Sequence, residues 1–139
     1  MSIKFFNEQI DFQPEKPQAI QKWISSVIES KGYTVGTINY IFCSDEYLLV
    51  LNQRYLDHDT YTDIITFDYT VDSVISGDIF ISVDRVRDNA ASYNKTFENE
   101  LQRVIIHGIL HLCGQEDKNE SDNIQMHAQE DLYLKWFEN

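Results

Sequence analysis

The sequence predicts an α+β fold, a single domain in which a mixed sheet of about four strands packs with about five helices. Two observations carry this prediction. Stretches rich in β-branched and aromatic residues recur along the chain, and segments with apolar residues at helical spacing separate them. No repeat or Pro/Gly-rich linker divides the 139 residues, so we expect one domain over 1–139.

The first half of the chain is predicted to hold two strands and two helices. Ser2–Phe6 can form an edge strand. A helix follows from Pro17 to about Lys31, because proline is favoured in a first helical turn and apolar residues then recur at i, i+3, i+4, i+7 and i+8. Thr37–Cys43 is predicted as a strand. Ser44 can cap a helix over 45–56, whose first turn is acidic.

The second half is predicted to begin with two strands, Thr62–Tyr69 and Gly77–Val83, which pair as neighbours. A short helix capped by Ser82 or Asp84 runs to about residue 93, and Thr96 begins a longer helix over 97–112.

A last helix is expected from about Asp122 to Phe137. We expect this helix to bury Ile124, Ala128, Leu132 and Trp136.

The composition indicates a globular protein and restricts its partners. Against 11 basic residues stand 23 acidic ones, a formal net charge of -12, which repels nucleic acid at long range. A phosphate-bearing substrate would therefore need a local cluster of basic residues. Cys43 and Cys113 form no CxxC pair, and there is neither a secretory signal nor an apolar run long enough to cross a membrane. We expect a cytoplasmic protein with no membrane contact.

His107 and His111 form the most informative pattern in the chain. Residues four apart project from the same face of a helix, so the two imidazoles point to one place. Gly114 is typical of a helix end, and the turn after it can bring Asp117 to the same place. Three protein ligands leave a coordination position open, as in catalytic zinc sites. The alternative is that both histidines line a partly polar groove without a metal.

Other side chains compete with Asp117 for the third ligand position. Glu116 is adjacent, but its side chain should point elsewhere if residue 117 faces the metal. His127 in the last helix is a further competitor, with an exposed helical position as the simpler interpretation. We expect one divalent ion, zinc, with manganese or magnesium as alternatives because a carboxylate ligand favours harder ions.

Gly108, directly after the first histidine, bears on the reaction. Zinc proteases of the HExxH type carry their general base, a glutamate, at this position. Because glycine has no carboxylate, peptide hydrolysis by that route lacks its base.

Residues 107–117 and four other segments resemble the YbeY family of bacterial rRNA maturation factors, which are metal-dependent, single-strand-specific endoribonucleases. The family pattern H-G-x-x-H-L-x-G-x-D-H is matched by His107, Gly108, His111, Leu112 and Gly114. The family segments L-N-x-x-Y, T-D-V-L-S-F and G-D-I-x-I-S are similar to residues 51–55, 62–67 and 77–82, and Met126 followed by Glu130 is similar to the C-terminal helix.

The sequence departs from the family pattern in two places. Asp117, preceded by Glu116, stands where the family has its last histidine, so the third ligand is carried over by position and not by residue type. Leu56 stands where the family usually has an arginine that binds phosphate or assists the chemistry. Other arginines could supply a cation from another direction: Arg54, Arg85, Arg87 or Arg103.

The resemblance implies an endoribonuclease that acts on single-stranded rRNA, in processing of the 16S rRNA 3′ end and in ribosome quality control. The ribosome or ribosomal proteins are further candidate partners, and the oligomeric state is not indicated. Two rival functions share the site. One is a hydrolase of peptides or small molecules, and the other is a non-catalytic ribosome assembly factor with a structural metal.

Three further residues are candidates for roles beside the metal. Arg103 lies one turn before His107 on the same helical face, so we expect it to stabilise charge on the phosphate. The simpler alternative is a surface ion pair with Glu100. Asp63 and Asp78 match positions of the family motifs, and we expect supporting or structural duties for both, such as orienting a ligand imidazole.

Overall fold

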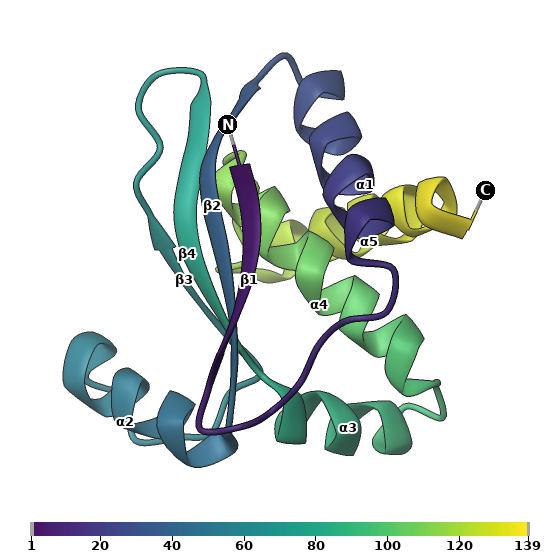
Figure 1. The fold of residues 1–139 in the computed structure, drawn as a ribbon. Helices are drawn as coiled ribbons and strands as arrows, with labels where there is room; N and C mark the ends of the chain where they lie inside the picture. The colour runs from purple at the N-terminus through teal and green to yellow at the C-terminus, as the bar shows by residue number, and fades with distance from the viewer. Residues whose placement is uncertain (1, 139) are drawn as a thin grey trace.

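A four-stranded sheet lies at the centre of this computed structural model, which describes residues 2–138 (Figure 1). The strands are β1 (Ser2–Glu8), β2 (Thr34–Cys43), β3 (Ile64–Asp68) and β4 (Val74–Ser82), in the order β1-β2-β4-β3. Both β1 and β4 run parallel to β2, whereas β3 is antiparallel to β4. The sheet is therefore mixed, as predicted, and the two strands expected to be neighbours do pair.

Five helices surround this sheet among the described residues. They are α1 (Pro17–Ser30), α2 (Asp45–Leu56), α3 (Val83–Ser92), α4 (Phe97–Leu112) and α5 (Glu120–Glu138). Figure 1 shows α1, α4 and α5 on one face of the sheet, with α2 and α3 at the end where β2 and β4 finish. The predicted α+β class is confirmed. The predicted bounds 1–139 of the domain stay a prediction, since residues 1 and 139 lie outside the described part.

Side-chain caps fix the starts of three helices where the sequence predicted them. The hydroxyls of Ser44, Ser82 and Thr96 each accept a hydrogen bond from the backbone N–H three residues further on, at 3.1 Å. Each such cap stabilises a helix by about 1 kcal/mol. Of the two predicted caps for α3, Ser82 is the one observed, while the Asp84 carboxylate accepts from the backbone N–H of Asp45.

The predicted buried face of α5 is wrong. Ile124, Leu132 and Trp136 are 65%, 50% and 43% exposed, and Ala128 is exposed as well. The buried side chains lie on roughly the opposite face: Met126, Glu130, Tyr133 and Leu134. The prediction failed because α5 carries apolar residues on both faces, and the face that packs includes a glutamate, which a hydrophobic pattern passes over.

Helix α4 lies very close to the sheet because glycines stand at the contact. A Cβ on Gly108 would lie 3.0 Å from Ile79 and 3.1 Å from Ile64, and one on Gly77 would lie 3.1 Å from Leu112. The apolar face of α4 is fixed on β3 and β4 in this way. Its polar face, which carries both histidines, is therefore turned toward the loop after α4 and toward α5.

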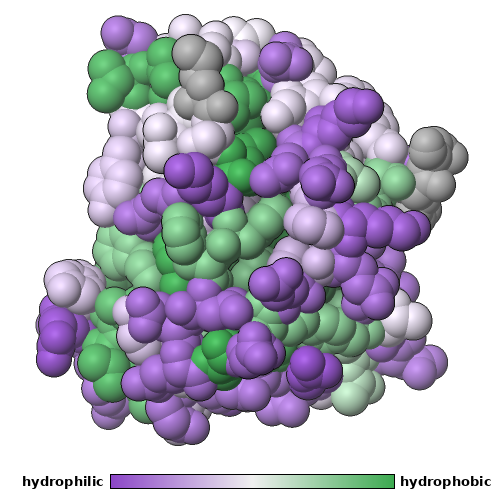
Figure 2. Space-filling model, viewed as in Figure 1, coloured by the Kyte–Doolittle hydropathy of each residue, from purple (hydrophilic) through white to green (hydrophobic). Residues whose placement is uncertain are grey.

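The surface is mostly hydrophilic, in keeping with the net charge of -12. In the view of Figure 2, apolar residues gather at the upper left, over the tip of the β3–β4 connection, where Val71 and Val74 are exposed. Across residues 2–138, none of the helices combines the length and the apolar character needed to cross a membrane.

Candidate metal centre

The end of α4 brings Asp117 to the two histidines. The N–H of Gly114 donates to the His111 carbonyl at 3.0 Å, and the N–H of Gln115 donates to the Leu110 carbonyl at 2.9 Å. This is the Schellman arrangement, which needs a left-handed residue after the helix, and Gly114 supplies it with φ +99°. The chain then reverses, so residue 117 lies over the last turns of α4.

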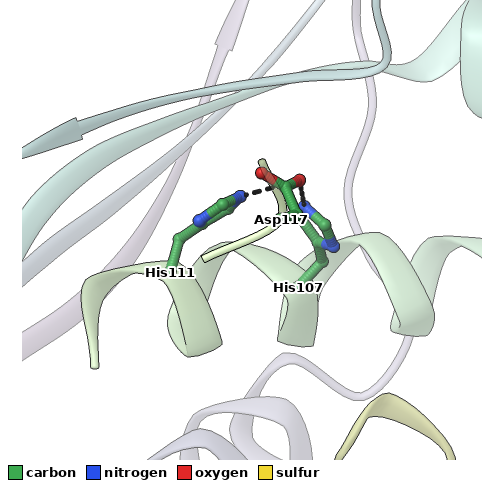
Figure 3. Close-up of side chains that lie close together, drawn as sticks. All are labelled: His107, His111 and Asp117. Carbon is green, nitrogen blue, oxygen red and sulfur yellow. Dashed lines mark hydrogen bonds and ion pairs between the residues drawn. The ribbon is translucent and has the colours of Figure 1, made fainter. Parts of the chain in front are cut away.

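The three side chains converge on one point (Figure 3). The Nε2 atoms of His107 and His111 lie 3.4 Å and 3.2 Å from the same oxygen, Oδ2 of Asp117, and a metal-binding atom from each residue lies within 4.8 Å of the others. Tetrahedral zinc with bonds of about 2.0–2.2 Å separates its ligand atoms by about 3.3 Å. The two separations from Asp117 match such an ion, and the assignment of these three residues as metal ligands stays a prediction.

The two competitors for the third position have other partners. Glu116 forms an ion pair with Lys118 at 3.5 Å. Nδ1 of His127 lies 3.4 Å from Glu130, and its side chain is 70% exposed. Among residues 2–138, neither side chain belongs to a cluster that could hold a metal.

Glu130, on α5, holds His107 from the side opposite Asp117. Its Oε2 lies 2.6 Å from Nδ1 of His107, and its Oε1 accepts from Arg103 at 2.8 Å. Because a carboxylate only accepts, Nδ1 carries the proton and Nε2 keeps the lone pair that a metal needs. Sequence reasoning gave Glu130 no role.

In the metal-free cluster, electrostatics favour the charged forms of both partners, so a metal ion would displace the proton on Nε2 of His107. Burial would raise the pKa of Glu130, but the hydrogen bonds from His107 and Arg103 outweigh it and lower the pKa. Burial also opposes charge on His107, yet the hydrogen bond and charge of Glu130, aided by Asp117, raise its pKa. The buried carboxylate is thus a firm anchor for both donors.

Arg103 lies where the sequence placed it, but its partners are on α5. Its Nη1 donates to Glu130 at 2.8 Å and its Nη2 to Asp131 at 2.6 Å, so the observed ion pairs do not involve Glu100. Through Glu130, the guanidinium group supports the orientation of His107.

Asp63 and Asp78 lie in different surroundings. Asp63, directly before β3, is half-buried beside His107 and Asp117, and burial raises the pKa of its carboxyl group. Asp78 lies within the sheet, where its carboxylate accepts from Nδ2 of Asn39 at 3.0 Å. The observed partner of His107 Nδ1 is Glu130, not Asp63 or Asp78. A supporting role for either aspartate stays a prediction.

Two cavities open on the cluster. One, of about 770 Å³, runs along α4 and α5, and the other, of about 520 Å³, follows β3. Both are lined by Asp63, Ile64, His107 and Asp117. An ion at this point would therefore face open space on two sides.

Comparison with known proteins agrees with this picture. A family model described as Endoribonuclease YbeY matches residues 3–138. Proteins named Endoribonuclease YbeY from Flavobacterium psychrophilum and Flavobacterium johnsoniae are 52% and 53% identical to the chain over 132 residues, which is 95% of this chain and 94% and 95% of theirs.

A solved structure is similar as well. The solution structure of a Thermotoga maritima protein has a TM-score of 0.70 and 26% sequence identity, and the match covers 98% of this chain and 89% of that one. With a family model over nearly the whole chain and relatives about half identical to it, the chain belongs to the YbeY family, as the sequence motifs predicted.

Proposed function

We propose that this protein is a metal-dependent endoribonuclease that cuts single-stranded rRNA during ribosome maturation. One observation carries the proposal: His107, His111 and Asp117 converge within 4.8 Å at the junction of two cavities. The names of the relatives supply the reaction class. Processing of the 16S rRNA 3′ end, ribosome quality control, contact with ribosomal proteins and a cytoplasmic location are parts of the proposal that rest on the family resemblance.

A divalent ion held by the three side chains would polarise the phosphoryl group and activate a water molecule for attack. The protein's own residues prepare the site for it. Glu130 fixes the His107 ring through Nδ1, so that Nε2 faces Asp117. Asp63 lies at the junction of the cavities, and its carboxyl group, with a pKa raised by burial, is our candidate for accepting a proton there.

Arg103 is our candidate for contact with the RNA phosphate. Its bond to Glu130 is buried, whereas its second partner, Asp131, has a side chain that is 64% exposed. A phosphate can replace the exposed carboxylate on Nη2 while Nη1 keeps its bond to Glu130. In this arrangement Arg103 binds substrate and still supports His107.

Zinc is the ion that we propose, with manganese and magnesium as the alternatives to test. Two imidazole nitrogens favour zinc over magnesium, and the one carboxylate is also an accepted zinc ligand.

A peptidase is the less favoured hydrolase. Gly108 packs against Ile64 and Ile79, so position 108 faces the sheet and has no room for a glutamate. The general base of an HExxH protease therefore has no counterpart here.

The test is a cleavage assay on single-stranded RNA, duplex RNA and casein in parallel, with zinc, manganese or magnesium added after chelation. We expect cleavage of single-stranded RNA only, and its loss in His111→Ala. His58→Ala is the matched control, since His58 is an exposed histidine in the α2–β3 connection. Casein cleavage would favour a peptidase, and zinc binding without cleavage of any substrate would favour an assembly factor. RNA cleavage that survives in His111→Ala would contradict the proposed site.

A further inference from the structure

Glu100 is a buried carboxylate without a partner. It is 5% exposed, and among residues 2–138 its side chain forms no hydrogen bond or ion pair. The other three buried polar residues, Asn52, Ser82 and Glu130, are all hydrogen-bonded. A carboxylate with so little access to water and no protein partner costs stability, so its presence at this point needs another reason.

The oxygens of Glu100 reach a cavity. Among the described residues, every side-chain nitrogen or oxygen without solvent access has a hydrogen-bond partner. Because the oxygens of Glu100 have no such partner, they must retain some access to solvent. The residue lines the 770 Å³ cavity that also contains His107 and Asp117. Glu100 is therefore an acceptor group presented to whatever enters this cavity beside the metal centre.

The position of Glu100 matches the length of one nucleotide. Glu100 precedes His107 by seven residues on the same face of α4, which places it about 10 Å along the helix axis from the histidine. A nucleotide whose phosphate lies at the metal centre can extend its base over this distance. The cavity volume of about 770 Å³ is within the range of small-molecule sites.

The charge on the cavity walls favours the binding of a neutral base over that of a phosphate. Its walls carry five carboxylates, from Asp63, Glu100, Asp117, Glu130 and Asp131, against the two permanent cations of Lys95 and Arg103. Arg103, our candidate for contact with the phosphate at the metal centre, keeps its bond to Glu130, and Lys95 lies exposed on the rim. The inner end therefore repels anions and suits a neutral group rich in N–H donors.

Guanine is the base that a carboxylate fits best. Its N1–H and N2–H donors are adjacent and parallel, so they match the two oxygens of one carboxylate. Uracil places carbonyl oxygens on both sides of its N–H, while adenine and cytosine place a ring nitrogen acceptor beside the amino group. Each of these would set an acceptor against an oxygen of Glu100.

We propose that the cavity along α4 and α5 binds the guanine base of the nucleotide next to the scissile phosphate, with Glu100 as the acceptor that selects it. This inference rests on the proposed endoribonuclease function. Glu100 determines specificity and takes no part in the bond-breaking step.

Binding and cleavage test the inference separately. In the zinc-loaded protein, titration with GMP, AMP, CMP and UMP followed by NMR should show GMP bound roughly tenfold to a hundredfold more tightly than the others. Glu100→Gln should lose this preference, because an amide offers one acceptor and one donor. Glu98→Gln, the same change at an exposed position of α4 outside the cavity, should keep it.

Cleavage of a random single-stranded RNA pool gives the second readout. Wild type should cut next to guanine, and Glu100→Gln should shift this preference toward adenine or cytosine while it still cuts RNA. Equal binding of the four monophosphates, or a guanine preference that Glu100→Gln leaves unchanged, would overturn the inference. If wild type binds a second metal ion that Glu100→Gln does not bind, Glu100 is a metal ligand and not the acceptor for guanine, which would also overturn the inference. Cleavage without base preference would overturn the guanine site alone, whereas GMP selection without cleavage would overturn only the endoribonuclease function.

Discussion

Replacing Glu130 by glutamine is the most direct test of how the metal centre is built. Glu130 is 2% exposed, and its two oxygens accept from Arg103 and His107. Glutamine keeps the size of the side chain but offers one acceptor and one donor. One of the two N–H groups would then face another N–H, so both the orientation of His107 and the stability of the metal-free fold should suffer.

The expected losses of zinc affinity and of stability can be estimated from the two contacts of Glu130. Loss of the group that orients a ligand histidine weakens metal binding about tenfold to a hundredfold, which corresponds to about 1.4–2.7 kcal/mol. Breaking a buried ion pair costs about 3–5 kcal/mol, and because glutamine retains one acceptor we expect a loss of about 3 kcal/mol. A domain is stable by about 5–15 kcal/mol, so the variant should still fold.

Competition with a chromogenic chelator measures the zinc affinity, and urea unfolding in EDTA measures the stability of the metal-free protein. Asp131→Asn is the matched control, because it removes the other carboxylate partner of Arg103, which is 64% exposed. This control should lose less than about 1 kcal/mol and keep its zinc affinity. If Glu130→Gln binds zinc as tightly as wild type, Glu130 does not orient His107 and the reasoning is refuted.

Gly77→Ala should destabilise the protein by about 1–3 kcal/mol, because the new Cβ would lie 2.6 Å from the Phe67 carbonyl oxygen; unchanged stability in urea would contradict this packing. Burial raises the pKa of Glu100 above 4.5, so wild-type stability should fall as the pH rises from the unfolded-state pKa through the folded-state pKa. Glu100→Gln should lack this fall and be the more stable protein at neutral pH. If the free energies of unfolding of the two proteins change in parallel with pH, the pKa of Glu100 is not raised. Zinc at about 100 times its Kd should stabilise wild type by about 2.7 kcal/mol, an effect that EDTA reverses. A thermal shift of the same size in His111→Ala would contradict the ligand assignment.

The fold was predictable where the signals are local. The caps Ser44, Ser82 and Thr96 act on backbone groups three residues away, so their effect can be read from neighbouring residues. The packed face of α5 was not predictable in this way. Both of its faces carry apolar side chains, and the choice between them depends on contacts with α1 and α4, which lie far away in the sequence.

The same difference between local and distant signals applies to the residues of the site. His107, His111 and Asp117 lie within eleven residues, and the turn at Gly114 fixes their relation, so a short pattern was enough to find them. Glu130 acts on His107 only because α5 packs on α4, and Glu100 is significant only because it is buried without a partner. Two signals for Glu130 were available: its place on the same helical face as Met126 and Leu134, and the similarity of Met126 and Glu130 to the family's C-terminal helix.

The contact between α4 and the sheet explains where the remaining chemistry of this site must come from. Gly108 faces Ile64 and Ile79 with a Cβ clearance of only 3.0–3.1 Å, so the position after His107 belongs to the core. A proton-transferring carboxylate therefore cannot come from the place that an HExxH protease uses. Carboxylates reach this site from three segments that meet the opposite face of α4: the residue before β3, the loop after α4, and α5. Asp63, Asp117 and Glu130 lie in those three segments, so the close packing at one glycine determines which parts of the chain supply the chemistry.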